Sequence, residues 1–158
     1  MDVLSCPPAG FVRLLQGGTV VLSGQNLVTD AAIEVILRSL LESDHVRSVV
    51  FADVSGQVVT AAARALPGVL ASSPVELTGD LAPEVARDLS GLQTVATWRA
   101  VLDPAAPLTF DCLGLVSNAG LLVAALPILA RTTVPGTPLV VEWTLAVRGA
   151  GSYRPGAV

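Results

Sequence analysis

The C-terminal third of the chain most constrains its fold, because it holds three strand-length apolar segments separated by turn residues. The segments are residues 108–116, 121–131 and 139–147, and Ser117-Asn118-Ala119-Gly120 separates the first two. In the last segment apolar residues occupy every second position: Leu139, Val141, Trp143, Leu145 and Val147. A period of two places these side chains on one face of a strand, so this face is predicted to be core. Successive strands with short connections predict an antiparallel sheet.

Turn residues divide most of the preceding chain into further short strands. Residues 11–15 and 19–22 flank Gln16-Gly17-Gly18, where two glycines can adopt the positive φ of a tight hairpin turn. Four more strands are predicted at residues 46–52, 57–60, 75–78 and 92–102. Ser55-Gly56 forms the turn between the first two of these, and residues 61–66 are predicted to form a helical turn.

One amphipathic helix is predicted from Asp30 to about Ser43. Five large apolar residues recur at helical spacing on one face: Ile33, Ile36, Leu37, Leu40 and Leu41. Thr29 or Asp30 is suited to cap the N-terminus, and Asp30 and Glu34 suit the positive end of the helix dipole. We expect the apolar face to dock against a sheet or against another subunit.

The predicted fold class is mainly β: an antiparallel, jelly-roll-like β-sandwich of six to eight strands with one helix near the N-terminus. Residues 11–148 are predicted to form one domain. Residues 1–10, with Pro7-Pro8, are predicted to be an extended arm, and residues 149–158 a C-terminal tail. Both ends are candidates for bridging subunits.

The order of these segments resembles a family of bacteriophage virion proteins, the tail-collar fibre and neck-fibre type. The matching elements span residues 24–148 and are listed in chain order: Asn26-Leu27-Val28 opening the helix, Asp111-Cys112-Leu113-Gly114-Leu115, Asn118-Ala119-Gly120-Leu121-Leu122-Val123-Ala124, and Val141-Glu142-Trp143-Thr144-Leu145. The Gly/Thr-rich segment usual in the family is replaced here by residues 56–74, rich in Ala and Val.

The resemblance implies a non-enzymatic structural protein in the neck, collar or tail of a phage particle. Such a protein would form a homo-oligomer, as a trimer or ring, and would join other virion structural proteins. Two alternatives remain open from the sequence: a carbohydrate- or receptor-binding β-sandwich module, and a capsid decoration protein. A sugar-binding module needs exposed aromatic residues, for which Tyr153, Phe11 and Phe51 are the candidates.

Composition supports protein–protein contacts over other partners. Hydrophobic residues make up 52% of the 158 residues and charged residues 14%, so apolar side chains exceed what one small core needs. The surplus predicts either an interface or an unusually Ala- and Val-rich core. All nine basic residues are arginine, which excludes lysine-dependent chemistry, and a net charge of −4 argues against direct contact with nucleic acid.

Few residues suggest chemistry, and no catalytic residue, cofactor or metal site is predicted. His45, the one histidine, is predicted to be a turn residue. The spacing of Asp80, Glu84 and Asp88 is better explained by a solvated surface than by a calcium loop. Cys112 is predicted to be buried, whereas Cys6 leaves open a disulfide within the chain or to a neighbouring subunit.

No membrane association is predicted. The segment ending in Cys6 lacks the basic and apolar parts of a lipoprotein signal. The uncharged residues 112–130 are interrupted by the turn at 117–120 and by Pro127. Trp98 and Trp143 are predicted to be core residues in preference to ligand-stacking ones.

Overall fold

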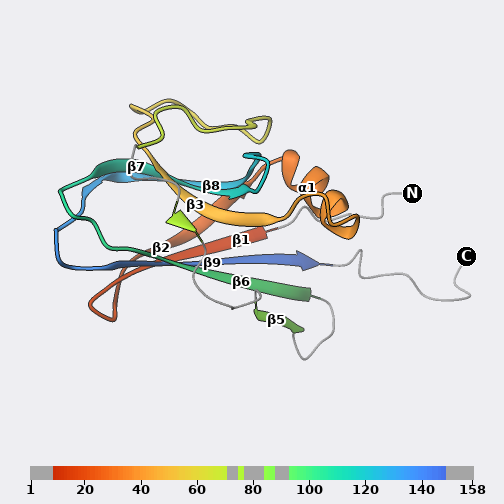
Figure 1. Ribbon diagram of the computed structural model, residues 1–158, viewed down its shortest axis with the longest axis horizontal. Helices are drawn as coiled ribbons and strands as arrows, with labels where there is room; N and C mark the ends of the chain where they lie inside the picture. Colours follow the sequence, from red (N-terminus) through yellow and green to blue (C-terminus); the bar gives the residue numbers. More distant parts are fainter. Residues whose placement is uncertain (1–8, 71–74, 77–83, 88–92, 149–158) are drawn as a thin grey trace, which may run out of the picture.

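The computed structural model describes residues 9–70, 75–76, 84–87 and 93–148. Within these ranges nine strands form one antiparallel sheet in the order β4-β3-β7-β8-β2-β1-β9-β6-β5 (Figure 1). The sheet folds over on itself into two facing layers, so the predicted antiparallel, sandwich-like fold class with one helix is confirmed.

The elements, in chain order, are β1 (Ala9–Gln16), β2 (Thr19–Val28), α1 (Ala31–Leu40), β3 (Val46–Ala52), β4 (Val75–Glu76), β5 (Glu84–Arg87), β6 (Gln93–Leu102), β7 (Thr109–Ser117), β8 (Leu122–Thr132) and β9 (Leu139–Arg148).

The C-terminal strands form one long hairpin that is bent in the middle. Its base is the β6–β9 pair in one layer, and its distal half is the β7–β8 pair in the other layer. The bend is held by Thr133, whose N–H donates to the Leu108 carbonyl at 2.8 Å and whose hydroxyl accepts the Leu108 N–H at 2.9 Å. Folding a long hairpin across two layers is the way a jelly roll is built, and it gives the core two opposed apolar faces.

Strand β2 connects the two layers a second time. Most of β2 pairs with β1 through the predicted hairpin, whose turn residues Gly17 and Gly18 have φ of 59° and 80°. Its last residues, Leu27 and Val28, pair with Ala125 and Ala124 of β8 in the other layer. The Asn26-Leu27-Val28 element therefore ends a strand, and the prediction that it opens the helix is wrong.

The main core lies between the layers, where Trp143, Phe51 and Phe110 are the largest buried side chains. The rings of Phe51 and Phe110 meet edge to face, with centroids 5.0 Å apart. On β9, Leu139, Val141 and Trp143 are at most 3% exposed, which confirms the predicted core face of this strand for these residues.

Residues 53–70 cover the outer surface of the β3–β7–β8 layer and enclose a second apolar cluster (Figure 1). Val54 and Leu66 anchor this segment, and the Asp111 carboxylate accepts the N–H groups of Val54 at 2.7 Å and Gly56 at 3.3 Å. The segment is held by this carboxylate, by packing and by single backbone hydrogen bonds to neighbouring elements, such as that from the Leu122 N–H to the Arg64 carbonyl at 2.9 Å, and not by a continuous ladder. The strand predicted at 57–60 and the helical turn predicted at 61–66 are therefore absent from it.

Strand β2 extends to Val28, six residues beyond its predicted end at Leu22. The other strand predictions agree with the structure to within a few residues, with two differences. β5 was not predicted, and β1 begins at Ala9, inside the predicted N-terminal arm. The strand predicted at 75–78 is described only as Val75–Glu76. The C-terminal tail 149–158 and residues 1–8 lie outside the described residues.

A substitution at Gly68 tests how residues 53–70, which we call the covering segment, are held against the sheet. Its φ is +66°, and a Cβ there would lie 2.0 Å from the Asp53 backbone oxygen, so Gly68→Ala must displace the main chain. We expect a loss of about 3 kcal/mol in the free energy of unfolding, measured with urea. Gly56→Ala is the matched control, because Gly56 has φ +73° with nothing near its Cβ; it should cost about 1 kcal/mol. Equal losses would contradict the close approach at Gly68.

Candidate assembly surface

Helix α1 begins directly after β2, at one end of the sandwich (Figure 1). Thr29 fixes its start: the buried hydroxyl donates to the carbonyl oxygens of Leu122 and Val123 of the β8 segment, and the Thr29 N–H donates to the Val123 carbonyl at 2.9 Å. Asp30 occupies the N-cap position but makes no side-chain capping hydrogen bond. Of the two predicted caps, Asp30 therefore holds the position, and Thr29 ties the helix to the sheet.

The side of α1 that is buried consists of small residues and is not the face that was predicted to dock. Ala31, Ala32 and Val35 are at most 4% exposed on the side of the helix that packs near β8. The five large residues predicted to form the docked face are exposed: Ile33 42%, Ile36 45%, Leu37 59%, Leu40 77% and Leu41 80%. The expectation that this face docks on the sheet of its own chain is wrong, because the short side chains let the helix approach the sheet from the opposite side.

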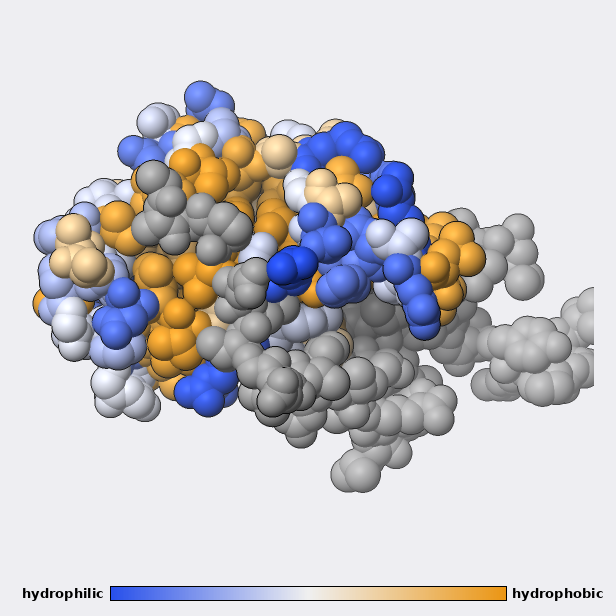
Figure 2. All heavy atoms as spheres, in the orientation of Figure 1, coloured by the Kyte–Doolittle hydropathy of each residue, from blue (hydrophilic) through white to orange (hydrophobic). Residues whose placement is uncertain are grey.

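The five exposed residues form one continuous surface, which we call the outer face of α1. At about 100° per residue they span an arc of roughly 140°, nearly opposite the buried alanines. Figure 2 shows this surface as an orange area at the right-hand end of the described residues. The helix ends at Leu40, short of the predicted Ser43, and Leu41 continues the apolar surface from the C-cap position.

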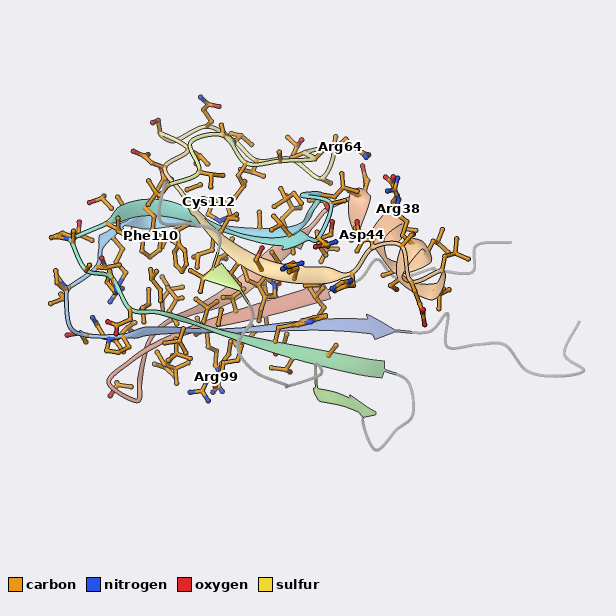
Figure 3. The ribbon with its side chains drawn as sticks, in the orientation of Figure 1. Arg38, Asp44, Arg64, Arg99, Phe110 and Cys112 are labelled. Atoms are coloured by element: carbon orange, nitrogen blue, oxygen red, sulfur yellow. The ribbon has the colours of Figure 1, made fainter. Side chains whose placement is uncertain are left out.

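One flank of the outer face is charged. Glu34 accepts hydrogen bonds from Arg38, one turn later at 2.7 Å, and from Arg64 of the covering segment at 3.1 Å (Figure 3). The hydrogen bond from Arg64, together with the positive charges of both arginines, lowers the pKa of Glu34 in spite of some desolvation. The carboxylate therefore stays ionised at the edge of the apolar surface.

Asp44 fixes the other end of the helix. Its side chain is 1% exposed and accepts hydrogen bonds from the Ser117 hydroxyl at 2.8 Å, the Ala119 N–H at 3.0 Å and the His45 N–H at 2.9 Å. Burial acts to raise the pKa of Asp44, but these hydrogen bonds and the charge of Arg38 bring it below its usual value. The carboxylate thus joins the end of α1 to the β7–β8 turn.

No sequence pattern singles out Asp44 or Arg64, because Ser117 and Ala119, which Asp44 holds, and Glu34, which Arg64 contacts, are distant along the chain. The orientation of α1 did leave a signal. Ala31, Ala32 and Val35 form a second, smaller apolar face opposite the large one. A helix with two apolar faces can bury either of them, and here the smaller face is buried.

The residues that the sequence suggested as candidates for catalysis, metal binding or a disulfide do not form a common site among the described residues. His45 is exposed and follows α1, as predicted for a turn residue. Cys112 is fully buried, as predicted, and burial raises the pKa of its thiol to about 11, so it remains protonated. Asp80, Asp88 and Cys6 lie outside the described residues, and Glu84 is in β5. Within the described part of the chain, no three His, Cys, Asp or Glu side chains are placed to hold a metal ion.

The aromatic residues are mostly in the core. Trp143 is fully buried and Trp98, its partner across β6 and β9, packs against the same core. Phe51 is 1% exposed and cannot serve as a surface aromatic, whereas Phe11 is 41% exposed. Tyr153 lies outside the described residues.

Two open hollows flank the covering segment. One, of about 380 Å³, lies between residues 65–69 and the ends of β3 and β7, and is lined by Arg47 and Asn118 among others. The second, of about 300 Å³, lies beside Asp111 and Pro127. Neither has an aromatic side chain in its lining, so neither offers the stacking surface of a typical sugar site.

Comparison with known proteins identifies no relative: no protein-family model, no curated protein and no solved structure matches the chain. Among the described residues, no helix has the length and apolar character needed to cross a membrane.

Asp44 predicts a defined dependence of stability on pH. Because its pKa is lowered by folding from the usual 3.8, its contribution is present above about pH 4 and is lost as the pH falls through the folded-state pKa. Asp44→Asn keeps the shape and removes the charge, and we expect it to cost about 1–2 kcal/mol at pH 7. Urea unfolding at several pH values should show the difference from the wild type shrinking below about pH 4. A difference independent of pH would contradict the assignment.

The two faces of α1 predict opposite sensitivities to truncation. Val35→Ala removes buried methyl groups and should lower the free energy of unfolding by about 1–2 kcal/mol. Leu37→Ala, a larger truncation on the exposed face, should change it by less than about 0.5 kcal/mol. The measurement is urea unfolding of dilute protein, so that self-association does not contribute. A larger loss for Leu37→Ala would mean that the outer face is covered within its own chain.

Proposed function

We propose that this chain is a non-enzymatic structural protein of a bacteriophage virion, located at the neck, collar or tail. It acts by forming a homo-oligomer, as a trimer or ring, and by binding other virion structural proteins. The resemblance of residues 24–148 to tail-collar and neck-fibre proteins supports the virion setting. The observation that carries the assembly role is the outer face of α1.

The outer face is suited to protein–protein contact because it is apolar, continuous and rigidly held. Its five side chains are 42–80% exposed, so most of their apolar area is available for burial. Covering it would contribute on the order of 12 kcal/mol per chain before the costs of association are subtracted. Since Thr29 and Asp44 fix both ends of α1, little ordering of the helix is needed on binding.

The charged flank fits the same role. Interfaces commonly have an apolar centre with a polar rim, and Glu34, Arg38 and Arg64 form such a rim along one side of the outer face. The carbohydrate-binding alternative has less support among the described residues: Phe11 is exposed, but the lining of the two hollows lacks aromatic side chains.

Analysis of purified particles tests the virion setting. Particles produced from the genome that encodes this chain would be purified on a density gradient, and their proteins quantified by mass spectrometry. We expect the chain to be present at a fixed copy number that matches a symmetric neck or tail assembly. A copy number matching the capsid axes would instead indicate a decoration protein, and absence from the particles would reject the proposed function.

A further inference from the structure

We propose that the outer face of α1 packs against the same face of a second copy of this chain, with the two helices antiparallel about a twofold axis. The inference rests on the proposed function in one respect, which is that this face is an assembly surface. It adds the identity of the occupant and the geometry of the contact.

The area of the outer face fits a symmetric pair. Its five partly to largely exposed side chains present on the order of 500 Å² of apolar surface, at the upper end of what a monomeric protein usually exposes in one patch. Two such patches facing each other would bury about 1,000 Å², which is near the lower limit for a specific protein–protein interface. A second copy therefore supplies the partner area that the contact needs, and the predicted affinity is moderate.

The distribution of the other exposed apolar residues favours a contact of this face with itself. A head-to-tail contact needs two different complementary patches on one molecule, whereas a twofold contact needs one. The other large exposed apolar residues in the described part of the chain are spread over β1, β2, residues 53–70, β8 and the β8–β9 connection: Phe11, Val20, Val58, Val69, Leu129 and Val134. On β1, Arg13 with its ion-pair partner Glu142 separates Phe11 from Leu15, so no second continuous stripe forms there.

The charges beside α1 favour the antiparallel arrangement. Glu34 and Arg38 lie one turn apart on the same flank. In an antiparallel pair, like flanks face each other with reversed direction, so Glu34 of one copy lies beside Arg38 of the other. In a parallel pair the charged flank of one helix would face the opposite flank of the other, which carries Ser39. The contact between Glu34 of one copy and Arg38 of the other would then be lost. Opposed helix dipoles also favour the antiparallel pair.

A twofold contact has a consequence for larger assemblies. Because it is complete with two copies, it cannot alone produce a trimer or an open ring. A ring containing this contact would need a second interface and an even number of chains.

The self-association is tested by sedimentation velocity and light scattering over about 1–500 µM, against the monomer mass of 16.1 kDa. We expect the wild type to pass from monomer to dimer within this range. Leu40→Glu places a charge within the contact, opposite residue 33 of the other copy, and should raise the dimer dissociation constant at least about 100-fold. Leu129→Glu is the matched control, because Leu129 is 91% exposed on β8; it should dimerise like the wild type. Circular dichroism confirms that both variants fold.

The orientation is tested with single cysteines in a Cys6→Ser background, where Cys112 is fully buried. Ile33→Cys and Leu40→Cys proteins are oxidised separately and as a mixture. In the antiparallel pair the mixture should cross-link at least about tenfold faster than either protein alone, because residue 33 of one helix lies near residue 40 of the other. Faster cross-linking of like positions would overturn the antiparallel geometry, and a trimeric mass would overturn the twofold contact.

The outcomes separate this inference from the proposed function. A wild type that stays monomeric at every concentration but is present in particles would reject the twofold contact and leave the virion role intact. A dimer broken by Leu40→Glu, in a chain absent from particles, would support the contact and reject the virion role.

Discussion

The junction formed by residues 27–30 is the constraint on which the rest of the structure depends. Leu27 and Val28 pair with β8 and join the two layers of the sheet, and Thr29 donates its N–H and hydroxyl to carbonyl groups of the same strand segment. The next residue, Asp30, donates its N–H to Ala61 at 2.8 Å and so anchors the covering segment. Sandwich closure, the start of α1 and the position of residues 53–70 therefore share one set of hydrogen bonds.

This junction also explains why α1 presents its larger apolar face outward. Burying the outer face instead would require the helix to rotate by about half a turn between two fixed ends. At one end Thr29 would lose buried hydrogen bonds to β8, and at the other Asp44 would leave the Ser117 and Ala119 groups without their acceptor. Each buried polar group left without a partner costs about 1–3 kcal/mol. These polar anchors, together with the close fit of Ala31 and Ala32, outweigh the apolar area left exposed.

The difference between the sequence predictions and the structure follows from the range of the interactions involved. Alternation along β9 and the Gly17-Gly18 turn are local signals, and both predicted the correct elements because each depends on residues that are adjacent in the sequence. The pairing of β9 with β1 and with β6 joins segments that are far apart in the chain, so such local signals do not predict it. Periodicity located the large apolar face of α1 but did not show whether it points toward the sheet or away from it. That orientation is set by Thr29 and Asp44, whose hydrogen-bond partners are more than 70 positions away. The covering segment was misjudged for the same reason, because Asp111, which holds Val54 and Gly56, is more than 50 residues further along the chain. β5 spans four residues, too few for a pattern to show.

In the structure the apolar surplus is divided between buried clusters and exposed residues of α1. The chain has a mean hydropathy of +0.68. Many of its Ala, Val and Leu residues are buried in two clusters on opposite sides of the β3–β7–β8 layer. The large residues of α1 belong to neither cluster. Both clusters are filled without the large residues of α1. The outer face of α1 is held at both ends of the helix and is bordered by Glu34, Arg38 and Arg64, an arrangement similar to the apolar centre and polar rim of many interfaces. The same hydrogen bonds that position α1 thus leave its large apolar residues exposed among the described residues.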